Sequence, residues 1–219
     1  MSTSWYLQDK NYFSGYEREE IEKVYGVFDE FLSQSAETYE ITVDGISKNI
    51  IIQSTQNYNE RRILFKEDDL TWGNIITHEN EKWLVTERPF FNKIHEKSKI
   101  QLCNNTIEFA KEVEGVIDHR DQFSNIIWDV PPSTQLVNFP CVLESISELN
   151  SKTTTGEQIN VPEGDMVLQI SYTTDELIDY GNEFKMFNNT YRISGIDNSK
   201  VHNNQGVIIL VVSRTANNT

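Results

Sequence analysis

The chain has 219 residues, long enough for one large domain or for two small ones with separate hydrophobic cores. Its 34 acidic and 19 basic residues give a net charge of −15, which argues against a protein that grips the phosphate backbone of nucleic acids. An apolar fraction of 37% is typical of a folded chain. The two cysteines, Cys103 and Cys141, support neither a zinc site nor a disulfide scaffold. Because the N-terminus lacks a signal-peptide pattern and no apolar run is long enough to span a bilayer, we expect no membrane association.

The first 38 residues are predicted to form an N-terminal arm and an amphipathic helix. Residues 1–13 carry large apolar side chains without a regular period, and such a segment packs either on the following helix or on a neighbouring molecule. Ser14 and Glu17 form a capping-box pattern, and apolar residues then recur every three or four positions. We therefore expect a helix from about Gly15 to Ser33. The arm residues that we regard as candidate partner contacts are Trp5, Tyr12 and Phe13.

From residue 39 onward, apolar and polar residues alternate, which is the pattern of half-buried β-strands. An Asp-Gly pair at positions 44 and 45 predicts a hairpin turn of two residues. The later loop Arg88–Ile94 carries Phe90 and Phe91 at its tip, which either contact a partner or fold back on the protein. We place the first β unit at residues 39–112. The first strands expected in it are Tyr39–Val43, Ser47–Gln53 and Arg62–Phe65.

A stretch of the first unit, residues 70–102, recurs 108 residues later without a gap. Gly73–Asn74 falls on Gly181–Asn182, Trp83 on Tyr191, and Ile100 on Ile208; the order and spacing of three strands agree. The alternative is a chance match between common turn and strand patterns. We favour a duplicated β unit, because the order and the spacing of three successive strands agree together.

The middle of the chain, residues 113–140, is harder to assign. Two short apolar runs in it are compatible with strands, but Pro131–Pro132 and Pro140 would interrupt a central strand. We therefore interpret it as a connecting segment and place the second β unit at residues 141–219. The run Val207–Val212 is so apolar that we expect a central strand. The fold class that follows is mainly β, an N-terminal helix followed by two tandem small antiparallel β-barrels or sandwiches.

No pattern of catalytic residues stands out. The four histidines have no spacing typical of metal ligands, and the sequence contains no nucleophile elbow, phosphate-binding loop or dinucleotide fingerprint. We expect a protein that is not an enzyme, with no catalytic residues, no cofactor and no metal site.

Several motifs together resemble a known group of proteins. These motifs are Tyr39–Gly45, Gly73–Ile76 followed by Glu81–Val85, Lys99–Asn104, and Tyr191–Asp197 followed by Gly206–Leu210. In this combination the chain resembles the head-closure and head-tail connector proteins of tailed phages that infect Gram-positive bacteria. The resemblance covers nearly the whole chain except residues 112–140. The sequence departs from the group at Asn74, where Asp is more usual, in a turn.

The resemblance implies a structural protein of the virion neck, made in the host cytoplasm. It would form an oligomeric ring with copies of itself between the portal or adaptor and the tail proteins. The ring would close the DNA-filled head until genome ejection and would provide a platform for the tail. DNA would pass through without sequence-specific binding, and the acidic balance suits a channel wall that repels DNA. Open strand edges would be further contact elements.

Two other functions stay open at this point. One is a structural protein of the tail, as a tail terminator, tail tube or baseplate component. The other is a monomeric host binding module with an aromatic groove built from Trp72 and Trp83. For Trp83 a place in the core is favoured, because its strand alternates apolar and polar residues.

Overall fold

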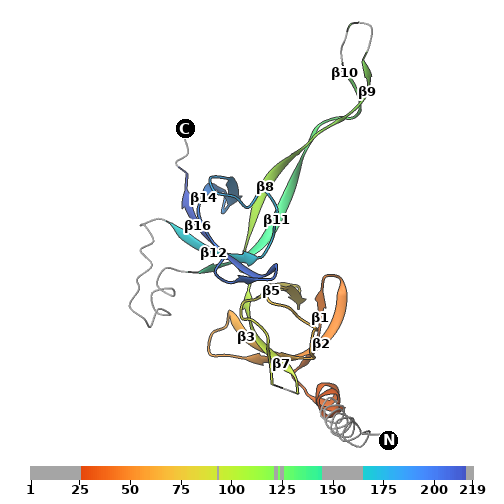
Figure 1. The fold of residues 1–219 in the computed structure, drawn as a ribbon, viewed down its shortest axis with the longest axis vertical. Helices are drawn as coiled ribbons and strands as arrows, with labels where there is room; N and C mark the ends of the chain where they lie inside the picture. Colours follow the sequence, from red (N-terminus) through yellow and green to blue (C-terminus); the bar gives the residue numbers. More distant parts are fainter. Residues whose placement is uncertain (1–25, 93, 121–122, 124–125, 145–164, 216–219) are drawn as a thin grey trace, which may run out of the picture. The chain divides into compact units, whose positions relative to one another are not determined.

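The computed structural model describes residues 26–92, 94–120, 123, 126–144 and 165–215. The fold is mainly β, with one helix near the N-terminus and two six-stranded antiparallel barrels, so the predicted fold class is confirmed (Figure 1). The helix occupies residues 26–34 of the described chain; the expected start near Gly15 lies outside the described residues. The chain divides into two compact units, Met1–Leu102 and Cys103–Thr219.

The first barrel is an antiparallel sheet closed on itself. Its strands follow the order β3-β2-β1-β4-β5-β7, and β7 pairs with β3 to close the ring. The short strand β6 adds to β7 outside this ring. Closure pairs the strand edges that a flat sheet would leave open. The bounds are β1 (Thr38–Val43), β2 (Ile46–Ser54), β3 (Glu60–Phe65), β4 (Ile75–His78), β5 (Glu81–Val85), β6 (Phe90–Phe91) and β7 (Glu96–Leu102).

The second barrel repeats this topology. Its ring order is β12-β11-β8-β13-β14-β16, closed by pairing of β12 with β16, and β15 adds to β16 as β6 adds to β7. The strands β9 and β10 pair only with each other. The bounds are β8 (Asn105–Val113), β9 (Val116–Arg120), β10 (Ile126–Val130), β11 (Ser133–Glu144), β12 (Met166–Ser171), β13 (Glu183–Met186), β14 (Asn189–Asp197), β15 (Val201–His202) and β16 (Gln205–Arg214).

The predicted repeat is confirmed down to single hydrogen bonds. The backbone N–H of Gly73 donates to the carbonyl of Val85 at 3.0 Å, and 108 residues later that of Gly181 donates to Ile193 at 2.9 Å. Both glycines have positive φ, 88° and 85°, which L-residues adopt only at a cost. The next turn also repeats, with two positive-φ residues at 79–80 and at 187–188. The two barrels are therefore two copies of one structural unit.

Each barrel has its own core, and the helix covers part of the outside of the first. Ile50 and Ile52 of β2 point into the barrel. Ile51 between them points outward, yet it is fully buried, because Phe28 and Leu32 of the helix pack on it. The predicted central strand, β16, pairs with β12 on one side and β14 on the other. The inward-facing residues of the second core include Ile107, Leu168, Phe184, Ile193 and Leu210.

The middle of the chain differs from the expected connection between units. Residues 105–144 supply β8 to β11, all within the second unit, so the first unit ends at Leu102 and not at 112. Pro131–Pro132 lie between β10 and β11, whereas Pro140 lies inside β11. There Pro140 faces Thr106 of β8, and the pairing with β12 begins only one residue later. A strand tolerates proline where one of its sides is not yet paired.

Candidate assembly surfaces

The main difference between the two barrels is a long hairpin, residues 112–134, which we call the hairpin arm. In the first barrel β1 and β2 are joined by the predicted two-residue turn, with φ of 49° at Asp44 and 80° at Gly45. In the second barrel the equivalent strands, β8 and β11, continue beyond the ring and lead into β9 and β10 (Figure 1). Beyond Val113 and Ser133, the described residues of the ribbon pair only with each other. Such a two-stranded ribbon has no second layer to cover its faces.

The hairpin arm exposes apolar side chains that a folded unit normally buries. Val116 and Val130 lie opposite each other across the two strands, and both are more than half exposed. Trp128 and Val113 are about two-fifths exposed. A run of exposed apolar residues on one element is typical of a surface that another molecule covers.

The two strands of the arm approach each other closely where β8 passes into β9. A side chain at Gly115 would meet the backbone nitrogen of Pro132 and the ring of Trp128, each at 2.7 Å from its Cβ. The indole ring therefore rests on the glycine backbone beside Pro132. This close approach requires glycine, and it holds Trp128 at one place on the arm.

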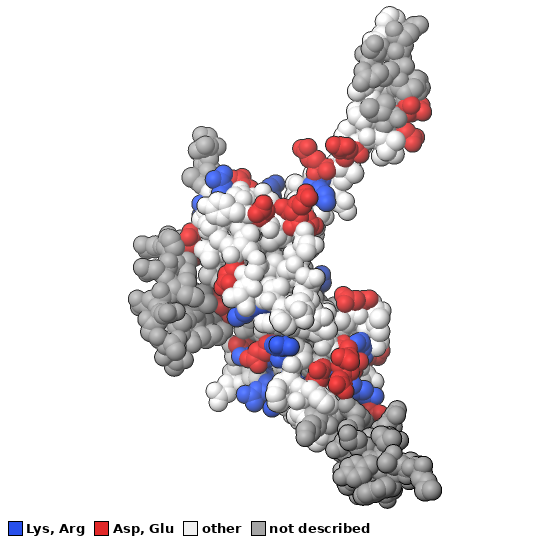
Figure 2. Space-filling view, viewed as in Figure 1, with Lys and Arg blue, Asp and Glu red and all other residues white. Residues whose placement is uncertain are grey.

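The charged residues of the arm are mostly acidic. Between residues 112 and 134 the sequence has five acidic residues and one basic residue. The side chains of Glu112, Glu114 and Asp129 are exposed, and none of them forms an ion pair with another described residue. Figure 2 shows red and white side chains prevailing over the described surface of the hairpin. The arm therefore combines exposed apolar and acidic groups.

Phe90 and Phe91, which we predicted to contact a partner, form the short strand β6 on the first barrel. Phe90 is 59% exposed, and the ammonium group of Lys97 lies 5.3 Å from the centre of its ring. Phe91 is half-buried. The equivalent loop of the second barrel forms β15, with Val201 and His202 in place of the two aromatics. Of the two residues, Phe90 offers most of the surface that a partner can contact.

Beside Phe90 lies an open groove of about 420 Å³ over the outer side of β3 and β7. Four basic residues line it and only one acidic residue, Glu87. Among the described residues, the side chains of Arg62 and Arg88 form no ion pair. Such a concentration of cations is unusual in a unit with 18 acidic and 12 basic residues among positions 1–102. We call this the basic groove; its cations are Arg62, Arg88, Lys97 and Lys99.

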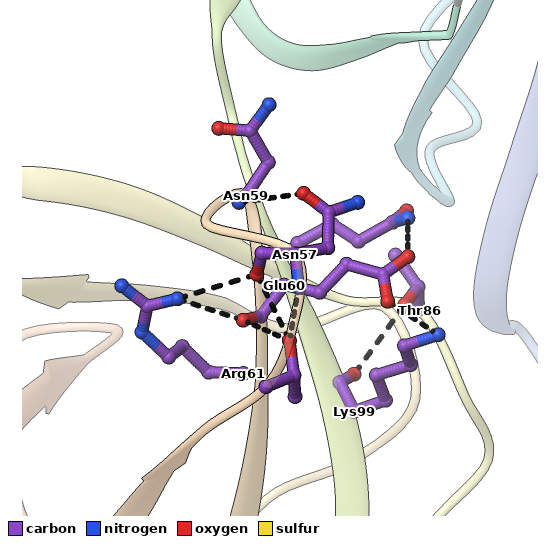
Figure 3. Close-up of polar contacts among 8 residues, drawn as sticks. Asn57, Asn59, Glu60, Arg61, Thr86 and Lys99 are labelled. Atoms are coloured by element: carbon purple, nitrogen blue, oxygen red, sulfur yellow. Dashed lines mark hydrogen bonds and ion pairs between the residues drawn. The ribbon is translucent and has the colours of Figure 1, made fainter. Parts of the chain in front are cut away.

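A network of polar contacts ties the start of β3 and the loop before it to β7, next to the basic groove (Figure 3). The carboxylate of Glu60 lies 2.8 Å from the Lys99 ammonium, and its other oxygen accepts a hydrogen bond from Gln101 at 3.0 Å. The guanidinium of Arg61 donates to the Tyr58 carbonyl at 2.8 Å. Because Glu60 neutralises Lys99, the positive charge available in the groove comes mainly from the other three cations.

Among the residues that the structure describes, three titratable groups have displaced pKa values, His95 and Glu96 in the first unit and Cys141 in the second. Burial, and secondly Lys97, lowers the pKa of His95, which stacks on Phe28 at 4.9 Å. Burial raises the pKa of Glu96, and the nearby carboxylates of residues 67–69 add to this. Burial raises the pKa of the Cys141 thiol to about 12. In the described residues no group of three or more His, Cys, Asp or Glu side chains is placed to hold a metal ion.

The other residues singled out in the sequence fall into two groups. Trp5, Tyr12 and Phe13 lie outside the described residues. Trp83 is buried in the first core, as favoured, whereas Trp72 is half-buried and its indole N–H donates to the Thr86 carbonyl at 3.1 Å. The described part of the chain has no helix whose length and hydropathy would let it cross a membrane.

The hairpin arm and the basic groove, the two most distinctive surfaces of the protein, were not predicted from the sequence. The arm was concealed because its apolar runs are short and interrupted by polar stretches and prolines. The basic groove gathers residues from four separate segments, so no local pattern contains it.

Comparison with known proteins agrees with the division of the chain into two units. Residues 11–102 match the YomX N-terminal domain, and this match ends where the first unit ends; residues 93–213 match the YomX C-terminal domain. The SPbeta prophage-derived uncharacterized protein YomX of Bacillus subtilis (strain 168) is 28% identical over 184 residues, which cover 81% of this chain and 83% of the relative. No solved structure matches the chain. Because the C-terminal domain alone accounts for more than half of the chain, the protein belongs to the YomX family.

Proposed function

We propose that this protein is a structural component of a phage particle, and that it forms a ring in the neck between the portal and the tail. The observation that carries the proposal is the hairpin arm, which displays uncovered apolar residues on a rigid, closed barrel. An element of this kind is built to be covered by another protein. The prophage origin of a relative that spans most of the chain supports a phage particle as the place of assembly.

The tandem barrels suit ring building. Closed barrels have few free strand edges, so they do not polymerise by edge pairing, and contacts are confined to arms and loops. A head-to-tail contact between unlike surfaces closes into a ring when its rotation divides a full turn. The resemblance of the strand and turn motifs to head-closure and connector proteins supports the neck as the location that we propose for this ring.

The charge of the chain fits a channel through which DNA moves. With a net charge of −15, the ring as a whole repels phosphate, so DNA would pass through it without being held. We propose no turnover, cofactor or metal for this role, and we place the protein in the virion after its synthesis in the bacterial cytoplasm.

The test is electron microscopy of particles made by the phage with the gene deleted and with the gene restored in trans. We expect heads that lose their DNA and carry no tails, and normal particles after complementation. Sealed, DNA-filled heads with defective tails would contradict the neck assignment and favour the tail. Infectious particles of normal appearance would contradict any structural role in the virion.

A further inference from the structure

We propose that the hairpin arm of one copy of this protein binds the basic groove on the first barrel of a second copy. The inference rests on the ring assembly proposed above and names the two surfaces that make its repeating contact. Both surfaces belong to this chain, so the contact can recur from one copy to the next.

The two surfaces are complementary in charge. The arm presents Glu112, Glu114 and Asp129, exposed and without ion pairs among the described residues. The groove presents Arg62 and Arg88, which are likewise exposed and form no ion pair among the described residues, and Lys97 lines the same groove. Unpaired charges of opposite sign on two surfaces steer them together and set the register of the contact.

The two surfaces are also complementary in their apolar groups. The groove lies between Phe90 at its rim and Leu64 in its wall. The arm supplies Val116, Trp128 and Val130, and the indole ring of Trp128 lies close to the backbone of Gly115. An aromatic side chain that meets apolar groups surrounded by charged ones is a common feature of protein interfaces.

A second copy of the chain fits the groove better than nucleic acid does. DNA phosphates would satisfy the cations but would leave the apolar rim at Phe90 uncovered. Glu87 lines the groove, and Glu60 already neutralises Lys99, so the positive field is short and local. The acidic and apolar arm matches both properties.

The experiment uses charge reversal in the full-length chain. One variant reverses the groove (Arg62→Glu with Arg88→Glu) and another reverses the arm (Glu112→Lys with Glu114→Lys). Control variants reverse exposed charges elsewhere in each unit, Lys82→Glu and Glu176→Lys. Sedimentation velocity over a concentration series measures self-association, and circular dichroism checks that each variant is folded. Arg62→Gln and Glu114→Gln serve as milder variants if a double reversal does not fold.

We expect the wild type and the controls to self-associate, more weakly as salt is added. Either reversal should weaken association about tenfold or more, because attraction becomes repulsion at two positions. An equimolar mixture of the two reversed variants should associate again, since each arm then meets a groove of opposite charge. A wild type that stays monomeric throughout, reversed variants that associate normally, or a mixture that stays monomeric would each overturn the proposal.

Two further measurements separate this inference from its alternatives. If the groove variant loses binding to duplex DNA while its self-association is unchanged, the groove serves nucleic acid and the proposal is wrong. If phage carrying either reversal still builds a normal neck that contains the protein, the arm–groove contact fails and the neck role stands. If the protein is absent from the neck but the mixture associates, the neck role fails and the contact stands.

Discussion

The repeated turn carries an asparagine in both barrels, Asn74 and Asn182. The side-chain amide accepts hydrogen bonds in the first barrel and donates them in the second. In the first barrel, the side-chain oxygen of Asn74 accepts hydrogen bonds from the backbone N–H and the hydroxyl of Thr71, at 2.6 and 2.9 Å. In the second barrel, the side-chain nitrogen of Asn182 donates to the carbonyls of Glu176 and Leu177, at 3.0 and 3.1 Å. Replacement by Asp retains an acceptor and removes a donor. Equivalent substitutions should therefore have unequal effects.

We expect Asn182→Asp to destabilise the second unit by about 2 to 3 kcal/mol, because two hydrogen bonds are lost and a carboxylate then faces two carbonyl oxygens. At about 4 to 8 °C per kcal/mol for a domain of this size, the melting temperature of that unit should fall by about 10 °C or more. Asn74→Asp keeps both acceptor bonds and should change the first unit by less than about 0.5 kcal/mol.

Differential scanning calorimetry measures the melting of each variant, and hydrogen exchange followed by mass spectrometry assigns the loss to one unit. The destabilisation by Asn182→Asp should shrink below about pH 4, where the protonated carboxyl can again donate a hydrogen bond. Equal losses for the two substitutions, or a larger loss for Asn74→Asp, would refute the reasoning.

Three further predictions concern the core, the arm and the half-buried carboxyl group of Glu96. Trp83→Ala should cost about 3 to 5 kcal/mol in urea unfolding, whereas Phe90→Ala, at an exposed position, should cost less than about 0.5 kcal/mol; similar losses would show that Trp83 is not a core residue. Gly115→Ala should change tryptophan fluorescence and speed hydrogen exchange at residues 116–130 while both barrels melt as before, and an unchanged arm would contradict the contact with Trp128 and Pro132. Since the folded pKa of Glu96 is raised above its unfolded value, its proton-linked stability is present below the ordinary carboxyl pKa and is lost as pH rises through the raised value. Glu96→Gln should therefore unfold at a higher urea concentration than the wild type at pH 7 and lose this advantage near pH 4. A stability difference between the two proteins that is the same at both pH values would contradict the raised pKa of Glu96.

The repeat could be predicted from sequence because it depends on local rules. Positive φ at Gly73 and Gly181, two-residue turns and alternating strands each leave a mark on consecutive residues. Because the same turn and strand patterns recur 108 residues apart, the sequence was enough to predict two copies of one β unit and, with them, the fold class.

The arm and the groove depend on pairing between distant segments, and this pairing leaves no such mark. Val116 and Val130 look like fragments of two weak strands until they are placed opposite each other. Pro140 looked like a strand breaker, because a sequence does not show where the pairing with β12 begins. Cations at positions 62, 88 and 97 become one surface only after the barrel has closed.

We propose that the protein forms a ring in the neck of the phage particle. The most direct measurement is a cryo-electron microscopy reconstruction of the neck of virions from the phage that encodes it. We predict a closed ring of this chain between portal and tail, with two six-stranded barrels in each copy. A neck in which all density belongs to other proteins, with this chain elsewhere in the particle or absent from it, would contradict the account.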